Sequence, residues 1–237
     1  MLTTSPDSGI AGPDSGIAGP DSGVAALRRA AMAACLALLL PAADPAAAAA
    51  ASVAERLSAA ALARTGVRVI YDPAYVRLAY PGGDVPADRG VCADVVIRAY
   101  RALGIDLQQR VHEDMTTAFD AYPKRWGLTR PDSNIDHRRV PNLEAFLKRQ
   151  GAALRVTDDP ADYRPGDVVA WNLRGSANGR GGFLPHIGIV TDRLAASGRP
   201  QVVHNIGAGP QLEDVLFAWP ITGHYRWLPE SALAAGN

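Results

Sequence analysis

The chain lacks the composition that marks several large classes of protein. Its 237 residues include two cysteines, and its 24 lysine and arginine residues are balanced by 24 aspartate and glutamate residues. A net charge of +0 provides no general attraction to nucleic-acid phosphates or to anionic lipids, so we expect no nucleic-acid partner. The length suits one domain with a full hydrophobic core better than two domains.

The first 27 residues also lack the pattern of a folded domain. The heptapeptide PDSGIAG begins at Pro6 and again at Pro13, and a degraded third copy begins at Pro20. Each copy contains proline and glycine, and none supplies the apolar seam of a coiled coil. We expect residues 1–27 to be disordered, or to be translated from a start codon placed too far upstream.

Residues 28–51 have the features of a secretory signal peptide. Arg28 and Arg29 precede the apolar stretch AAMAACLALLL at 30–40, and Pro41 and an alanine-rich run follow it. A basic start, a short apolar core and small residues near a cleavage site are typical of such leaders. The apolar core is shorter than the roughly 20 residues that a retained span needs. We therefore expect an exported protein, periplasmic or in the cell envelope, with no stable membrane insertion once the leader is cleaved near 48–51. An uncleaved anchor is the alternative.

Residues 52–237 are expected to form one α+β domain. Helical spacing of apolar residues predicts helices at 52–65, 92–103, 108–122 and 142–150, and β-branched alternation predicts a short strand at 67–71. The last third predicts strands at 167–171, 186–192, 201–205 and 224–227. Helices followed by strands indicate an antiparallel sheet packed on the preceding helices.

Cys92 is the only cysteine beyond the leader, so the exported domain has no partner for an internal disulfide. It begins the second predicted helix, whose apolar stripe runs through Val95, Val96 and Ala99 to a terminating Gly104. A helix N-terminus favours a thiolate over a thiol. Cys92 is thus either a buried small residue or a nucleophile, and we favour the nucleophile.

Two histidines stand on strands where they can serve this thiol. His186 opens an apolar strand, which places a polar ring at the end of the sheet, where it can act as the base. His204 lies on the next strand, and antiparallel pairing would set it beside His186 to orient the imidazole. Asn205, on the opposite face of that strand, is the alternative third group.

Four segments together resemble a known family. They are GVCADVV at 90–96, RPGDVVAW at 164–171, PHIGIV at 185–190 and VVH at 202–204. In order and spacing they resemble the NlpC-type peptidoglycan endopeptidases, and most closely the uncharacterised bacterial family named domain of unknown function 1287; the resemblance covers residues 52–227. It implies a papain-like fold, cleavage of amide bonds in peptidoglycan stem peptides or similar peptides without a cofactor or metal, and Cys92, His186 and His204 as the catalytic triad.

The resemblance also suggests residues that bind the substrate. The oxyanion is expected to meet the backbone N–H of Cys92 and a group from an upstream loop, for which Tyr71 or Tyr75 is the candidate. The typical acid before the nucleophile is missing, and Asp94 follows it instead. Asp94 either recognises an ammonium or amide group or caps the helix. The polar loop carrying His137, Arg138 and Arg139 either holds a substrate carboxylate or is a solvated surface.

Three other functions remain open from the residues alone. The domain could transfer or hydrolyse another acyl group, or it could be a non-catalytic module that binds the cell envelope. A zinc amidase could draw its ligands from His186, His204 and His224 with Asp192 or Asp214, although no short-spaced ligand pair is present. The sequence leaves the oligomeric state open.

Overall fold

The computed structural model describes residues 45–229, with side chains from residue 53 onward. The heptapeptide repeat at 1–27 and the predicted leader up to residue 44 lie outside the described residues. Within the described part, no helix is both long and apolar enough to cross a membrane.

The predicted helices are present, with shifted ends. They are α1 (Pro45–Arg64), α2 (Cys92–Ala102), α3 (Leu107–Ala118) and α4 (Val140–Arg149), with 3₁₀ turns at Phe119–Ala121, Asp136–Arg138 and Pro160–Asp162. Ser52 lies inside α1 and does not cap it, because the preceding alanines, the strongest helix formers, extend the helix toward the N-terminus. Gly104 follows α2 with φ of 79°, the left-handed conformation expected after a helix end.

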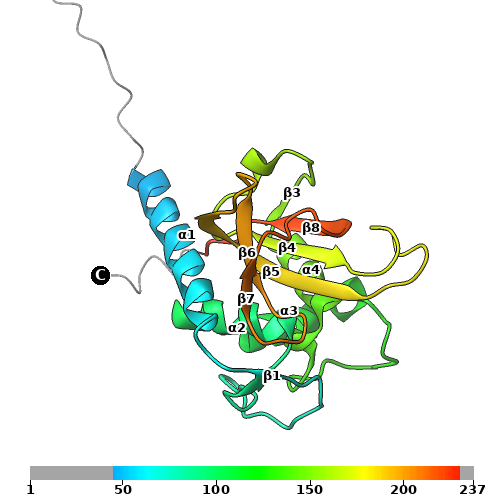
Figure 1. The fold of residues 1–237 in the computed structure, drawn as a ribbon. Helices are drawn as coiled ribbons and strands as arrows, with labels where there is room; N and C mark the ends of the chain where they lie inside the picture. The colour runs from blue at the N-terminus through cyan, green and yellow to red at the C-terminus, as the bar shows by residue number, and fades with distance from the viewer. Residues whose placement is uncertain (1–44, 230–237) are drawn as a thin grey trace, which may run out of the picture. The chain divides into compact units, whose positions relative to one another are not determined.

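The sheet has six strands in the order β3-β8-β4-β5-β6-β7, and all its pairings are antiparallel. Its strands are β3 (Ala153–Leu154), β4 (Val168–Asn172), β5 (Pro185–Leu194), β6 (Pro200–His204), β7 (Gln211–Glu213) and β8 (Ile221–Tyr225). The α+β class is confirmed (Figure 1). Two further short strands, β1 (Ile70–Tyr71) and β2 (Arg89–Gly90), form a separate parallel pair.

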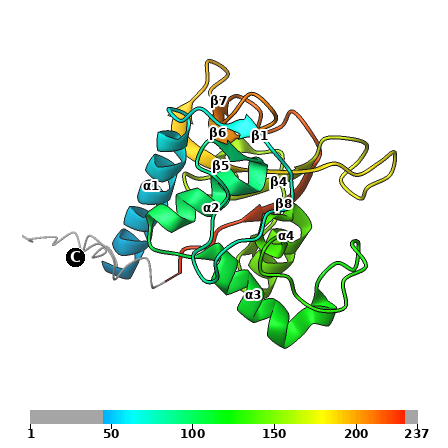
Figure 2. The ribbon, with the colours of Figure 1, turned by 90° about the horizontal axis from the view of Figure 1, so that it is seen from below.

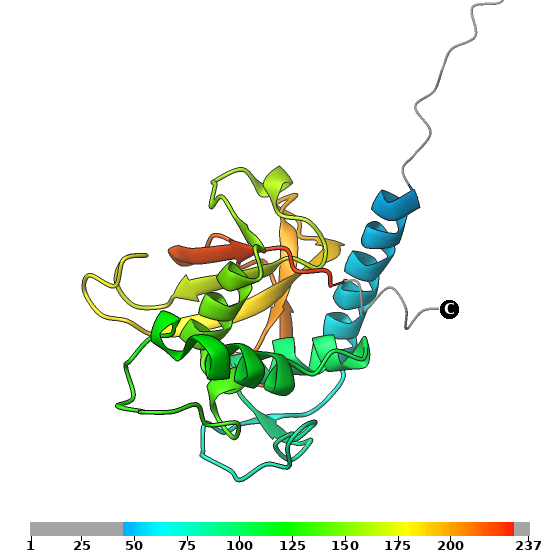
Figure 3. The same cartoon turned by 180° about the vertical axis from the view of Figure 1, so that it is seen from behind.

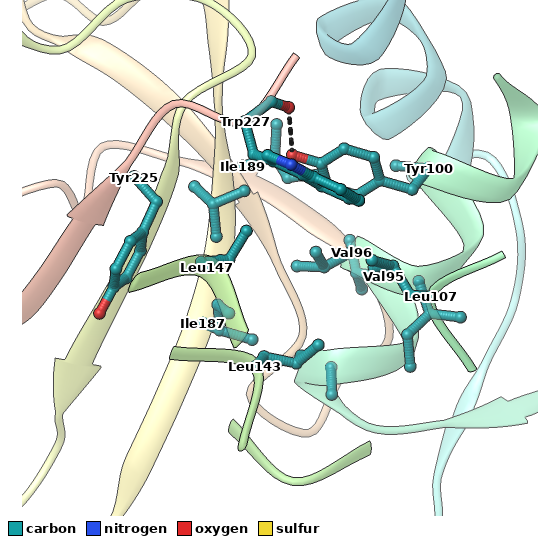
Figure 4. Close-up of a cluster of buried hydrophobic side chains, with 14 of the residues drawn as sticks. Val95, Val96, Tyr100, Leu107, Leu143, Leu147, Ile187, Ile189, Tyr225 and Trp227 are labelled. Atoms are coloured by element: carbon teal, nitrogen blue, oxygen red, sulfur yellow. Dashed lines mark hydrogen bonds between the residues drawn. The ribbon is translucent and has the colours of Figure 1, made fainter. Parts of the chain in front are cut away.

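Strand alternation divides the core between the two faces of the sheet. Ile187 and Ile189 of β5 pack with Val95 and Val96 of α2 and with Leu143 of α4 (Figure 4). Helices α1, α2 and α4 all contact β5, and the turned views show them beside the sheet (Figures 2 and 3). The opposite face is covered by a smaller cluster: Tyr163, Val169, Trp171, Val190, Val202 and Leu216. The central strands are therefore buried on both faces.

The turn between β4 and β5 is closed at its base by one buried side chain. Asn172 pairs with Pro185 at the end of the two strands. Its amide Nδ2 donates hydrogen bonds to the carbonyl oxygens of Ser176 (2.8 Å) and Gly182 (2.9 Å), and its Oδ1 accepts the N–H of Leu184 at 2.8 Å. These bonds fix the chain directly before His186.

Candidate active site

Cys92 is the first residue of α2, as the sequence predicts. Its thiol interacts with the backbone N–H groups of Cys92 and Ala93, at the start of the helix, and with the backbone N–H of Ile187 on β5. The helix start is capped by Asp94, whose Oδ2 accepts the N–H of Val91 at 2.6 Å. The first turn of α2 therefore abuts the first peptides of β5.

The electrostatics of the thiol differ from the expectation. Cys92 is only 5% exposed, and burial raises the pKa of its thiol to about 11, although the neighbouring N–H groups lower it in part. Loss of hydration outweighs the helix terminus, because a thiolate depends on solvent more strongly than a thiol does. The resting group is a neutral thiol and not the thiolate that the helix position alone predicts.

Tyr71 reaches this thiol from the small parallel sheet. Its backbone pairs with Gly90, two residues before Cys92, and its side chain lies close enough to the Cys92 thiol for the two groups to affect each other's ionisation. Burial, followed by the charge of Cys92, raises the pKa of Tyr71 to about 12, so the phenol stays protonated and can donate. The residue is nevertheless 39% exposed. Of the two tyrosines suggested by the sequence, Tyr71 is the one that contacts Cys92.

His186 and His204 form the pair that the sequence predicts. Nε2 of His186 lies 2.8 Å from Nδ1 of His204, and both rings are almost fully buried. Because His204 pairs with Gly188, the two rings lie on the sheet face that carries Trp171, with Trp171 and Trp219 packed against them. Ile187, between His186 and Gly188, turns its side chain toward α2 and its N–H toward the thiol.

Burial and charge act on the two imidazoles differently. Burial, followed by the influence of His204, lowers the pKa of His186 to about 3, so this ring is neutral near pH 7. Burial also lowers the pKa of His204, but the carboxylate of Glu213 opposes that effect. The neutral imidazole of His186 has the protonation state that a general base requires.

Glu213 is the residue at this site that sequence reasoning missed. Its Oε2 lies 2.8 Å from Nε2 of His204, although it is displaced from the N–H direction, so the contact is mainly electrostatic. Strand β7 has three residues and follows a glycine-rich turn, so its sequence has too little alternation to predict a strand. The sequence signal that could have found it is an acidic residue a short turn after the strand that ends at His204.

Asp94 and Arg138 are buried against each other and are not open to a ligand. Nε and Nη2 of Arg138 lie 2.9 Å from Oδ1 and Oδ2 of Asp94. The guanidinium also donates to the backbone carbonyls of Asp72 and Ala74, one and three residues after Tyr71. Of the two roles considered for Asp94, the structure therefore shows the cap, and Arg138 braces the segment that carries Tyr71.

The other suggested binding residues lie away from Cys92 or are held by other contacts. His137 is buried, and burial lowers its pKa to about 4. Arg139 pairs with Asp136 at 2.8 Å and lies over the ring of Trp126. These two residues do not form the open carboxylate clamp that the sequence suggested.

Tyr75 and Asn205 serve the backbone around the site. The hydroxyl of Tyr75 donates to Asp132 at 3.1 Å and accepts from Asn134, which ties its loop to the polar segment near 134. Asn205 is buried, donates to the carbonyl of Gly90 at 3.5 Å and accepts the N–H of Gly207. Of the two candidates for the third group, His204 is the one that contacts His186.

The residues suggested as zinc ligands do not assemble as a set: His186 and His204 are in contact, but His224 lies elsewhere. In the part of the chain that the structure describes, no three His, Cys, Asp or Glu side chains are placed to share an ion. His224 lies with Asp167, whose Oδ2 is 2.7 Å from its Nε2, and Arg226 pairs with the same carboxylate.

Comparisons with known proteins identify a family, a relative and a solved structure. The family described as "Domain of unknown function (DUF1287)" matches residues 58–227. "Uncharacterized protein YijF" of Escherichia coli (strain K12) is 57% identical over 162 residues, which are 68% of this chain and 76% of that protein. Among solved structures, NlpC1 from Trichomonas vaginalis is similar at a TM-score of 0.39 and 14% identity; the match covers 73% of this chain but only 44% of that one.

Proposed function

The chain belongs to the DUF1287 family, as its sequence suggested, and on that premise we propose that it is an exported cysteine hydrolase that cleaves amide bonds. Cys92 is the nucleophile, His186 the base and His204 the group that orients the base, in a papain-like arrangement. The favoured substrates are the stem peptides of peptidoglycan. This substrate follows from the resemblance of the sequence motifs to NlpC-type enzymes and from the predicted leader.

One observation carries the proposal. The first turn of α2 and the first peptides of β5 meet at the sulfur of Cys92, where the N–H of Ile187 and the hydroxyl of Tyr71 also converge. His186 precedes Ile187, and its Nε2 is engaged by His204. The Nδ1 nitrogen of His186 is therefore the one left to take a proton from the thiol. A nucleophile, a base and a group that orients the base are the elements of a triad.

The resting protonation states define how the reaction begins. The pKa of the thiol is raised to about 11 and that of His186 is lowered to about 3, so the pair rests as neutral thiol and neutral imidazole. The proton moves from sulfur to His186 as the sulfur attacks the carbonyl carbon, as in serine hydrolases. The imidazolium then gives this proton to the leaving amine, and water, deprotonated by the same ring, hydrolyses the thioester.

The oxyanion requires donors at the thiol. The N–H groups at the start of α2 and the hydroxyl of Tyr71 are directed there. Each such donor is worth about 10²- to 10³-fold in rate when it is aligned with the developing charge.

Digestion of purified sacculi tests the activity. The purified protein and its Cys92→Ala variant are incubated with sacculi, and released fragments are identified by mass. The wild type is expected to release stem-peptide fragments, and the variant is expected to release none while still binding sacculi. Binding by both without release would indicate an envelope-binding module. Turnover of a thioester or ester substrate without release from sacculi would instead indicate acyl transfer or hydrolysis on another substrate.

A second experiment tests the pairing of thiol and imidazole without a substrate. A short bifunctional alkylating reagent such as 1,3-dibromoacetone reacts first with a thiol and then with a nucleophile within a few ångströms. Peptide mapping should find Cys92 linked to His186. The His186→Gln variant should be alkylated at Cys92 without the second link. Exclusive linkage to Tyr71 in the wild type would contradict the role of His186.

A further inference from the structure

Glu213 lies on the same face of the sheet as the two catalytic histidines. It pairs with Val202 on β6, two residues before His204, so its side chain and that of His204 share the face that carries Trp171. Its carboxylate oxygen Oε2 is 2.8 Å from Nε2 of His204. The Glu213 side chain is 45% exposed while that of His204 is fully buried, so the carboxylate reaches the ring from the solvent side.

His204 has few other polar neighbours. Among the described residues, the charged or titratable groups within contact of its ring are His186 on β5 and Glu213 on β7. The uncharged rings of Trp171 and Trp219 cover it from β4 and from the segment before β8. The protonation of the ring is therefore governed by two contacts, one at each nitrogen.

The two contacts determine where the protons lie. A carboxylate attracts a proton and has none to donate, so the 2.8 Å contact favours the tautomer of His204 with its proton on Nε2, even though the oxygen lies off the N–H direction. In the neutral ring, Nδ1 of His204 is then an acceptor, and Nε2 of His186, 2.8 Å away, must be its donor. This leaves Nδ1 of His186 unprotonated, which is the form that the proposed base requires.

We propose that Glu213 is a positioning residue that fixes the tautomer of His204 and, through it, that of His186, making Nδ1 of His186 the basic nitrogen. The catalytic consequence rests on the proposed function, but the tautomers themselves are observable without turnover. Glu213 has no other side-chain partner among the described contacts, since the nearby Arg199 and Ser197 bond to Asp214. A purely architectural role for the Glu213 carboxylate would need such a partner.

Imidazole ¹⁵N NMR on the intact protein tests the proposal directly. Two-bond ¹H–¹⁵N spectra distinguish protonated from unprotonated ring nitrogens, and the His186→Gln and His204→Gln variants assign the signals. We expect the wild type to show both rings protonated at Nε2. In Glu213→Gln the side-chain amide can either donate to Nε2 of His204 or accept from it, so the preference should weaken and both rings should populate the Nδ1-protonated form as well. Asp214→Asn, which removes the same charge at the residue directly after β7, should leave both rings unchanged.

A pH–rate profile tests the consequence for the reaction. We expect Glu213→Gln to lower kcat by about tenfold, the size of effect seen for partners that orient a histidine, with little change in KM. The acid limb of the profile should move to lower pH, because the carboxylate favours the protonated form of His204. A merely structural role would not shift this limb.

The outcomes separate this proposal from the proposed function. Tautomers that are the same in the wild type and Glu213→Gln, or that change equally in Asp214→Asn, would overturn the role of Glu213 even in an active enzyme. If the wild type has no hydrolase activity but the tautomers shift in Glu213→Gln as expected, the role of Glu213 is supported and the proposed hydrolase function is rejected.

Discussion

Arg138 and Asp94 form a two-bond ion pair beneath the candidate site, with both side chains almost fully buried. The pair connects the first turn of α2, where Cys92 lies, to the 3₁₀ turn Asp136–Arg138. Because the same guanidinium bonds to the carbonyls of Asp72 and Ala74, it also holds the segment after Tyr71. One side chain therefore braces both the start of the helix that carries Cys92 and the segment that follows Tyr71.

Removing one partner of this pair should be costly. Arg138→Met leaves a buried, unpaired carboxylate and should lower the free energy of unfolding by about 3–5 kcal/mol. Urea denaturation measures the change. The double variant Asp94→Asn/Arg138→Met should recover part of the loss, since no buried charge remains. Arg89→Met, which breaks the more exposed pair with Asp72, is the control and should cost less than about 1 kcal/mol. Equal costs for Arg138→Met and Arg89→Met would contradict the prediction.

The thiol of Cys92 should react slowly near neutral pH. Burial raises its pKa to about 11, so the rate of alkylation by iodoacetamide should keep rising up to pH 10 in the folded protein. In urea the rate should level off near pH 9, as expected for a thiol with an ordinary pKa of about 8.5. Alkylation with a plateau below pH 7 in the folded protein would show a resting thiolate–imidazolium pair instead.

The hydroxyl of Tyr71 should matter more for turnover than for folding. Tyr71→Phe keeps the ring but removes the donor at the thiol, and it should lower kcat by about 10²-fold in the sacculus assay. Tyr75→Phe is the matched control, because its hydroxyl contacts Asp132 and not Cys92. The prediction fails if the two variants lose activity to the same extent.

Stability should fall in mild acid through buried histidines. Burial lowers the pKa of His137 to about 4, whereas in the unfolded chain the value is about 6.5. Below pH 6.5 the unfolded chain binds a proton that the folded protein refuses, so stability is full above pH 6.5 and is lost as the pH falls toward 4. The loss is at most about 1.4 kcal/mol per pH unit for each such histidine.

Urea denaturation of the wild type and His137→Gln between pH 8 and 4.5 checks this effect. Below pH 6.5 the free energy of unfolding of the variant should fall less steeply with pH, and the difference in slope should correspond to at most one bound proton. Between pH 7 and 8 the stability of both proteins should change little. Parallel curves for the two proteins would show that His137 does not contribute to the acid sensitivity.

The sequence predicted those parts of the fold whose signals are local. The apolar stripe of α2 and the alternation of β4, β5 and β6 placed Cys92, His186 and His204 on the right elements, and the pairing of β5 with β6 brought the two histidines together. The short strands β2, β3 and β7 were not predicted, because two or three residues carry no periodicity and these strands form only against their partners.

The remaining features of the site depend on contacts across the chain. Tyr71 reaches Cys92 through a parallel pairing that spans the loop between β1 and β2, and Arg138 meets Asp94 from 44 residues away. The raised pKa of Cys92 comes from burial by several elements, whereas the helix position visible in the sequence suggested the opposite direction. Glu213 was missed because its role depends on a strand that was not predicted.

Asn172 isolates the start of β5, which carries His186, from changes in the loop that precedes it. Because its amide holds the carbonyls of Ser176 and Gly182 at the base of the β4–β5 turn, residues 177–181 form a loop whose sequence and length can change without shifting the start of β5. Natural variation and laboratory libraries can therefore be concentrated in this loop, and grafting a new recognition segment there should leave the histidine pair in register.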